Sequence, residues 1–481
     1  MVGFGQNQLK VRVQHSILHY LSNLILKLKI GMKEHGMMKH KRWATVRVLI
    51  WQHIWAIGTG VMILLSVFLS LMIWFNSNQS IAKSTVNDTT GVISTPKSQK
   101  NIYAIEQLLW NNAMGQHEAI LDFRPTTRQI LKRLSSWSVD KVKSRSVSRQ
   151  ELMQLAKQKN TAVLGFGDGI AGEIVSKVVG TQFDLPANGY VFNVVVPLSA
   201  NPHKVYFLDD KHLKVYEFTV THIDKILKNV SLSQTKNRVP VKVAYFSQHL
   251  MLKYTQSLQM ATYSYLLAST KVDTFVTALF ADSQATPRGY QEQANVIYND
   301  GDSKQLTINT KKNTLQFDNY HTNLPISSYS DRLHSGYTML KQLQQLPDNL
   351  YYFESHHDGR DLVFRLYSNG LPIFNQNGYG TVVIKTKSAK HVTLEFSQYI
   401  LQVPLPVDDD EITEVVPTDT VLATLAQAGY HHTDIADMRI GYTWETDSQN
   451  ENIVVLKPEW YVELSKNETW HPVSALTKEV Q

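Results

Sequence analysis

The sequence contains no cysteine among its 481 residues, which excludes several kinds of chemistry at once. Disulfide bonds, thiol catalysis and cysteine-ligated metal centres all need a side chain that is absent. Three further signatures are missing: the sequence has no G-x-S-x-G elbow, no G-x-x-x-x-G-K-[ST] phosphate loop and no H-E-x-x-H zinc motif. An exported chain of this kind must be stabilised by its hydrophobic cores, and its length permits that.

Most of the chain carries no excess of basic charge, although the net charge is +7. Nine of the 48 Lys and Arg residues lie before residue 48, where Glu34 is the only acid among 41. The remaining 39 basic and 40 acidic residues nearly cancel. The body of the protein therefore lacks the basic surface that nucleic acid binding requires, and no nucleic acid partner is expected.

Residues 48–75, "VLIWQHIWAIGTGVMILLSVFLSLMIWF", carry no charge. From Ile54 to Phe75, 22 mostly apolar residues give a helix long enough to cross a hydrocarbon layer of about 30 Å. The stretch is longer than a signal-peptide core and no small-residue cleavage site follows it. We predict an uncleaved single-pass anchor in the cell membrane. The basic flank favours a cytoplasmic N-terminus and extracellular C-terminal domains.

The anchor carries a pattern of small residues that is typical of helix–helix contact. Thr59, Ile63, Ser66 and Ser70 are spaced by four, three and four positions, which places them on one helical face. Small residues at this spacing let a second membrane helix approach closely. We predict that these four residues form a transmembrane interaction face. The alternative is that small residues are scattered here without function.

Composition and periodicity predict an α+β fold, in which a single N-terminal transmembrane helix precedes a multi-domain extracytoplasmic region of antiparallel sheets and packed helices. The predicted segments are a basic cytoplasmic tail at 1–47 with Met37 or Met38 as an alternative start, the transmembrane helix at 48–75, a Ser-, Thr- and Asn-rich linker at 76–100, and α+β domains at 101–240, 241–347 and 348–481.

Local patterns locate several elements. Apolar residues at helical spacing predict a helix over 272–280, and Thr270 with Asp273 resembles a capping box at its start. Alternating apolar residues around a polar turn predict a hairpin over 306–317. Beyond residue 349, Asp-Gly and Asn-Gly pairs predict turns between strands. A final helix is predicted to end at Gly429.

The stretch "GDGIAG" matches the glycine spacing of dinucleotide-binding folds, with Gly167, Gly169 and Gly172 between an apolar run and a helix-like run. The next strand-like run ends without the acid that would bind a ribose, and the segment is predicted to lie outside the cell. A turn is therefore favoured over a cofactor site, and no cofactor is predicted.

Three clusters of polar residues are candidates for functional sites. The acids Asp408, Asp409, Asp410, Glu411 and Glu414 have proline on both sides, which is typical of a solvated loop, although paired carboxylates also catalyse glycoside hydrolysis. The histidine clusters lack the spacing of known zinc sites, since adjacent side chains in a strand point to opposite faces. We predict no catalytic residues and no metal centre. The histidine clusters are His356-His357-Asp358 and His431-His432 with Asp434 and Asp437.

Several stretches, taken in order, resemble one known family. They are "LLSVFLSLMIWF", "YSYLL…VDTFVTALFAD", "YNDGDSKQLTINTKKNTLQF", "FRLYSNGLPIF…GYGTVVI" and "LKPEWYVEL". The sequence is similar to the YycH regulatory proteins of low-GC Gram-positive bacteria over the anchor and roughly residues 100–475.

The resemblance implies a non-enzymatic accessory protein. It would regulate the sensor histidine kinase of the cell-wall-homeostasis two-component system through transmembrane and extracytoplasmic contacts, together with a YycI-type single-span protein. In that family the glycines of "FGDGIAG" have no cofactor role. Two alternatives remain open: an extracytoplasmic enzyme acting on the cell wall, and a ligand-binding module.

Overall fold

The computed structural model describes residues 62–66, 97–180, 183–198, 204–222, 235, 237–344, 346–405 and 412–478. The chain separates into two compact units, Met1–Asn87 and Asp88–Gln481. In the first unit only residues 62–66 are described, and they are helical. Among the described residues, no helix is long and apolar enough to cross a membrane. The predicted membrane helix over 48–75 otherwise falls outside the described residues.

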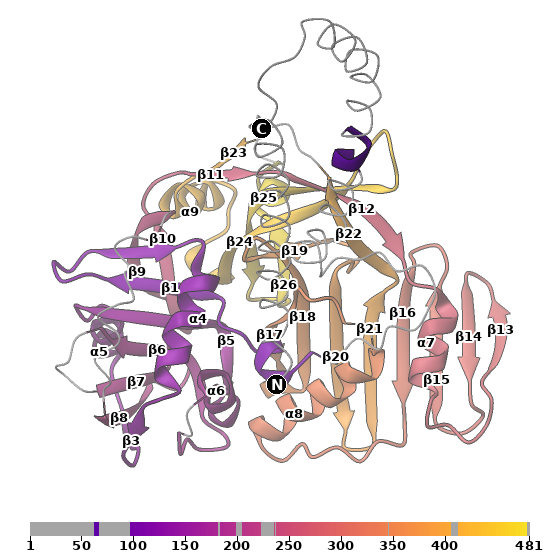
Figure 1. Ribbon diagram of the computed structural model, residues 1–481, viewed down its shortest axis with the longest axis horizontal. Coiled ribbons are helices and arrows are strands. Elements are labelled where there is room, and N and C mark those ends of the chain that lie inside the picture. The colour runs from indigo at the N-terminus through magenta and orange to yellow at the C-terminus, as the bar shows by residue number, and fades with distance from the viewer. Residues whose placement is uncertain are drawn as a thin grey trace, which may run out of the picture. The chain divides into compact units, whose positions relative to one another are not determined.

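The second unit begins with an antiparallel sheet of ten strands, in the order β10-β9-β2-β1-β5-β6-β7-β8-β3 with β4 paired to β8 (Figure 1). Its strands are β1 Gln107–Asn111, β2 His117–Ile120, β3 Ser138–Val139, β4 Lys143–Ser146, β5 Thr161–Ala171, β6 Tyr190–Pro197, β7 Lys204–Asp209, β8 Lys214–His222, β9 Arg238–Phe246 and β10 His249–Tyr254. The helices of this part are α3 Gln99–Ile102, α4 Phe123–Leu134, α5 Arg149–Ala156 and α6 Gly172–Val179.

Helices cover both faces of this first sheet, which explains its nearly continuous apolar strands. Leu164 of β5 packs in one core with α4 and α6, whereas its neighbour Val163 packs in another core with α5. Because successive side chains of a strand point to opposite faces, a central strand covered on both sides must be apolar at almost every position. The run "YVFNVVVP" of β6 meets this requirement.

A second sheet of fourteen strands follows, in the order β13-β14-β15-β16-β21-β20-β18-β19-β24-β25-β12-β22, with β17 paired to β18 and β26 to β25. Its strands are β12 Tyr263–Ser269, β13 Arg288–Glu292, β14 Asn295–Asn299, β15 Lys304–Asn309, β16 Thr314–Asn319, β17 Leu350–His356, β18 Asp361–Ser368, β19 Leu371–Phe374, β20 Thr381–Ser388, β21 His391–Ser397, β22 Tyr399–Leu405, β24 Ile435–Thr446, β25 Ile453–Leu464 and β26 Thr469–Pro472. A separate pair is formed by β11 Leu258–Ala261 and β23 Ile412–Val415.

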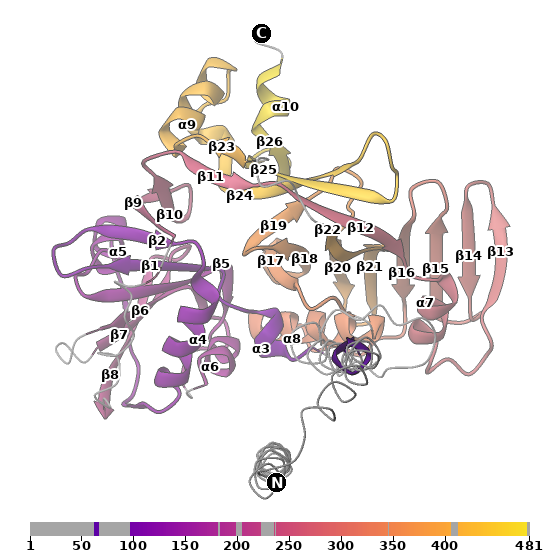
Figure 2. The same ribbon diagram turned by 45° about the horizontal axis from the view of Figure 1, so that its top comes forward.

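Four helices accompany the second sheet: α7 Val272–Leu279, α8 Tyr329–Leu340, α9 Thr418–Gln427 and α10 Val473–Thr477. Figures 1 and 2 show the two sheets side by side, with α3 and α8 at the junction between them. One hydrophobic core runs across this junction, because Ile174 of the first part belongs to the same cluster as Leu333 and Phe364 of the second. The α+β class predicted from the sequence is confirmed.

Several local predictions are confirmed by the strand register. Leu306 faces Phe317 and Ile308 faces Leu315 in the hairpin β15–β16. Asn369 and Gly370, with φ of 46° and 86°, form the turn between β18 and β19. Gly429, with φ of 90°, follows α9 as predicted for a residue that ends a helix.

The predicted capping of α7 by Thr270 is wrong. The helix begins at Val272 after Lys271, and no side chain caps it. The amide of Thr270 instead donates to the carbonyl of Gln398 at 2.9 Å, which extends the pairing of β12 with β22 by one residue. Thr270 therefore continues the strand pairing just past the end of β12, and the helix starts one residue too late for its hydroxyl to cap.

Two strands make pairings that cross the predicted domain boundaries of the external region. β9 extends across the boundary at residue 240 and pairs with β2 of the first sheet. β16, which lies before residue 347, pairs with β21, which lies after it. The assignment of three domains stays a prediction.

The first described residues of the second unit, 97–99, contact the second sheet before the chain enters the first sheet. The Lys97 ammonium donates to the carbonyls of Asp348 and Leu350, next to β17. The Tyr337 hydroxyl of α8 donates to the carbonyl of Lys97 at 2.7 Å. The side chains of Gln99 and His334 are 3.0 Å apart. Residues 97–99 are thus fixed to α8 and β17.

Candidate functional site

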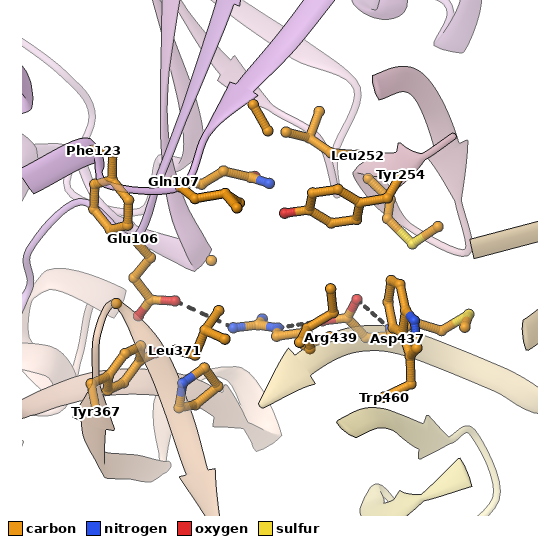
Figure 3. Close-up of a pocket in the computed structure, with 18 of the residues that line it drawn as sticks. Glu106, Gln107, Phe123, Leu252, Tyr254, Tyr367, Leu371, Asp437, Arg439 and Trp460 are labelled. Carbon is orange, nitrogen blue, oxygen red and sulfur yellow. Dashed lines mark hydrogen bonds and ion pairs between the residues drawn. The ribbon is translucent and has the colours of Figure 1, made fainter. Parts of the chain in front are cut away.

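Charged side chains from both sheets meet in a buried space at the junction, shown in Figure 3. Glu106 immediately precedes β1, and His249 begins β10, so both belong to the first sheet. Asp437 and Arg439 are two positions apart on β24, and therefore point to the same face of the second sheet. We call these four residues the buried ion network.

Arg439 is the centre of this network. Its Nε donates to Asp437 Oδ2 at 2.8 Å, and its Nη1 lies 3.4 Å from Glu106 Oε2. Nε2 of His249 lies 3.0 Å from the other oxygen of Asp437. The guanidinium also lies 4.6 Å from the ring centroid of Phe353, a distance at which cation–π attraction contributes. One cation thus joins acids from two sheets.

Burial and neighbouring charge set the ionisation of the network. Burial raises the pKa of Glu106 to about 8, although the charge of Arg439 and the nearby Tyr367 hydroxyl act in the opposite direction. Burial also acts against ionisation of Asp437, but the charges of His249 and Arg439 hold its pKa well below the usual range. The pKa of His249 is raised, because Asp437 outweighs the effect of burial.

The glycine motif of the sequence lies beside this network, and its structure differs from a phosphate-binding loop. β5 continues through residues 161–171 with an irregular register between Gly165 and Ile170, and α6 starts at Gly172. The predicted turn is therefore wrong, because the segment is an irregular strand. A Cβ added to Gly167 would lie 3.0 Å from Nη1 of Arg439 and collide with the carboxyl group of Glu106. Gly167 leaves room for the ion pair.

Asp168, between the motif's first two glycines, attaches the first sheet to β17. Its Oδ2 accepts hydrogen bonds from the Tyr352 hydroxyl at 2.9 Å and from the backbone amide and hydroxyl of Ser355 at 2.7 and 3.0 Å. The hydroxyl of Tyr329 in α8 donates to the carbonyl of Gly169. The strand that resembled a cofactor loop is thus a contact between the two sheets.

The space around the network has a volume of about 170 Å³ and is lined by residues of both sheets. Glu106 Oε1 and the Tyr367 hydroxyl are buried there without a full hydrogen bond to another described atom. The network pairs charges, and burial raises the pKa of the Tyr367 hydroxyl beside Glu106 well above its ordinary value, which makes this hydroxyl a poor nucleophile. Its arrangement suits electrostatic coupling of the two sheets better than bond-making chemistry.

The structure brings few of the sequence-predicted residues together. Of the proposed transmembrane face, Ile63 and Ser66 lie in the short described helix, whereas Thr59 and Ser70 fall outside the described residues. The acids at 408–411 also fall outside them, and Glu414 faces Gln259 in the β11–β23 pair.

The second histidine cluster, for which the sequence predicts no metal centre, is divided between separate contacts. The His431 amide donates to Asp434 Oδ2 at 2.8 Å in a short turn, whereas Asp437 belongs to the buried ion network. Glu106 and Arg439 were not predicted from the sequence as site residues. They are 333 positions apart. The opposite charges of Asp437 and Arg439 on one strand face were the only local signal of a buried pair.

The fold and the network define a large α+β protein in which buried charged groups join two sheets. Residues 248–480 match the family model described as YycH protein, C-terminal domain. The fold is similar to the crystal structure of YycH from Bacillus subtilis, with 16% sequence identity, a TM-score of 0.63, and coverage of 80% of this chain and 99% of that chain. A comparison with curated proteins found no match. Residues 248–480 thus form a YycH C-terminal domain, and the likeness to the solved YycH chain shows a shared fold.

Replacing Glu106 with Gln tests the electrostatics of the network. A carboxyl group whose pKa is raised by folding stabilises the protein fully below its unfolded value, here 4.5, and this stabilisation is lost as pH rises through about 8. Glu106→Gln should therefore become more stable relative to the native chain as pH increases over this window, by at most about 1.4 kcal/mol per pH unit.

The measurement is urea denaturation of both proteins at several pH values between 5 and 8.5. The charged and ionisable groups that face Glu106 are Arg439, Arg124, Asp168 and Tyr367, and the variant leaves all of them in place. Glu151→Gln on the exposed surface is the control and should leave the slope unchanged. A difference between Glu106→Gln and the native chain that does not vary with pH would contradict the burial of an ionisable carboxyl here.

Proposed function

We propose that this protein is a membrane-anchored accessory protein that regulates the activity of a cell-wall-homeostasis sensor histidine kinase. The observation that carries the proposal is the match of residues 248–480 to the YycH C-terminal domain, together with a fold that covers 99% of the solved YycH chain. The uncharged segment 48–75 supports a single-pass location in the cell membrane, with the N-terminus in the cytoplasm. A YycI-type single-span protein is the proposed second partner.

The mechanism we propose is a choice between two arrangements of the kinase's membrane helices. A bound regulator shifts such an equilibrium only by the difference between its affinities for the two states. The anchor supplies the helix contact through Thr59, Ile63, Ser66 and Ser70. The external sheets, joined by the buried ion network and by Asp168, supply one coupled body for the extracytoplasmic contacts.

The helix contact is testable by a membrane two-hybrid assay of the full chain against the sensor kinase of the same organism. Ser66→Leu with Ser70→Leu adds two bulky side chains to the proposed face and should reduce the signal at least about tenfold, because small residues permit close helix approach. Val61→Leu with Phe68→Leu alters the opposite face of the same helix and should leave the signal intact.

Membrane levels of each variant are measured in parallel. No signal from any well-expressed protein would reject the regulator proposal and direct attention to the acids at 408–411 and an enzymatic role. Equal loss in both double variants would reject the assigned face but not the role of the anchor.

A further inference from the structure

Three potential metal ligands converge near the end of β17. Glu354 and His356 are two positions apart on β17, and Glu463 lies on β25. One ligand atom from each lies within 4.8 Å of the other two. Glu354 is buried, and the other two side chains are partly buried. We call these three residues the Glu–His–Glu cluster.

The distances within this cluster fit ligands of one ion better than hydrogen bonds. Nε2 of His356 lies 3.4 Å from Oε1 of Glu354. A good hydrogen bond between nitrogen and oxygen is shorter, at about 2.7–3.2 Å. Two ligand atoms at about 2.0–2.1 Å from a tetrahedral zinc ion lie about 3.3 Å apart. The observed separation is therefore close to that of two neighbouring ligands, and in the absence of metal the same two atoms form an ion pair when His356 is protonated.

The second polar atom of each of these two side chains is held by another residue. Trp470 Nε1 donates to Oε2 of Glu354 at 2.8 Å. Nδ1 of His356 lies 3.2 Å from Oε2 of Glu468, so a carboxylate fixes the ring with Nε2 toward the cluster. Protein metal sites use such outer contacts to orient their ligands, and a carboxylate behind a ligating histidine is a frequent arrangement.

Two cations lie near the cluster, but both have other contacts. Arg365 lies 4.7 Å from the ring centroid of Phe353 and donates to the Thr381 hydroxyl. Arg439 is engaged in the buried ion network. Among the described residues, no ion pair links either arginine to Glu354 or Glu463. Three carboxylates, those of Glu354, Glu463 and Glu468, thus surround a single histidine, an arrangement that a divalent cation would balance.

The site also has room for a further ligand. Glu354, His356, Glu468 and Trp470 all line a cavity of about 720 Å³. Three protein ligands with an open fourth position are typical of zinc sites that bind water or an exchangeable ligand, whereas purely structural sites have four protein ligands.

We propose that Glu354, His356 and Glu463 bind a divalent transition-metal ion of the zinc class, with one coordination position open to this cavity. The ion would link the end of β17 to β25. This would join two strands that are not neighbours in the fourteen-stranded sheet. Neither the family match nor the proposed role as a kinase regulator assigns such a site, and the proposal stands independently of that role.

The test is a titration of the full chain, purified in detergent without a histidine tag and stripped with a chelator, with zinc chloride. We expect one tightly bound Zn²⁺ per chain and a rise in the thermal transition. Cobalt chloride should give the visible absorption of tetrahedral Co²⁺. His356→Gln and Glu463→Gln should each weaken zinc binding at least about a hundredfold, because removing a ligand costs more than the 10–100-fold loss of an outer partner.

Two further variants serve as controls. His357→Gln changes the neighbouring histidine, whose side chain is exposed and faces Asp361, and should leave zinc binding unchanged. Glu468→Gln should weaken binding by about 10–100-fold without abolishing it. Because Glu463→Gln keeps the side chain's size and removes one of two crowded carboxylates, it should fold in the absence of metal. A native thermal transition without zinc would confirm that.

Two results would overturn the proposal. The first is a native chain that binds no stoichiometric zinc at micromolar concentration, which would mean that His356 only balances the surrounding acids as a cation. The second is a folded His356→Gln protein that binds zinc as tightly as the native chain, which would assign the ion to other histidines among the 18 in the sequence.

Discussion

Replacement of Arg439 by Met is expected to lower the free energy of unfolding by about 3–5 kcal/mol, the cost typical of removing one partner from a buried ion pair. Arg439 lies between the two sheets with only 16% of its side chain exposed, and Asp437 depends on its charge and on His249 to stay ionised. Methionine preserves the unbranched stem that packs near Phe353. The loss should therefore come from the missing charge and hydrogen bonds.

Urea denaturation at pH 7.4 measures this loss, with Arg145→Met as the matched control. Arg145 forms an ion pair with Glu151 whose two side chains are 44% and 41% exposed, so its removal should change stability by no more than about 0.5–1 kcal/mol. Adding Asp437→Asn to Arg439→Met should recover part of the loss, since the uncompensated acid is then gone. Equal losses in Arg439→Met and Arg145→Met would show that the network contributes nothing to stability.

Replacement of Gly167 by Ala is expected to cost about 3 kcal/mol or more. Gly167 has φ of +74°, a conformation that costs an L-residue roughly 1–2 kcal/mol. The added Cβ would also collide with the carboxyl group of Glu106 and press on Arg439. Overpacking of this kind adds about 1–3 kcal/mol, because the surrounding groups must move. The measurement is again the urea midpoint of the full chain.

Gly378 provides a close control for this prediction. Its φ is +79°, almost the same as that of Gly167, but a Cβ there would meet nothing within 4 Å. Gly378→Ala should therefore cost only the backbone share, about 1–2 kcal/mol. The difference between the two variants isolates the crowding at the ion pair. If both variants lose the same amount, the close approach of Glu106 to β5 does not matter for stability.

Much of the fold can be predicted from local sequence patterns, whereas the site is formed by residues that are distant in the sequence. The hairpin containing Leu306 and Phe317 follows from alternation alone, and the turn at Asn369 follows from the conformational freedom of its Gly partner. Each of these signals lies within about a dozen residues. The prediction for α7 failed at its first residue because a strand contact of Thr270 decided where the helix begins.

The buried ion network could not be predicted in the same way. Glu106 and Arg439 come from different sheets, and nothing in the residues around Glu106 distinguishes it from an exposed acid. The spacing of the glycine motif matches that of a ligand loop, although a simple turn was favoured. Only the three-dimensional structure shows that Gly167 accommodates a carboxylate of the same chain. The Glu–His–Glu cluster had one local signal, the Glu354-x-His356 alternation, which adjacent His357 obscured.

The attachment of residues 97–99 has a mechanical consequence. Lys97 is fixed to the carbonyls beside β17, and the hydroxyl of Tyr337 holds its own carbonyl, before the chain turns into the first sheet. Tension or torque transmitted along the preceding segment would thus reach the fourteen-stranded sheet first. The ten-stranded sheet would receive this force only through the junction, where the contacts of Arg439 and Asp168 join the two sheets.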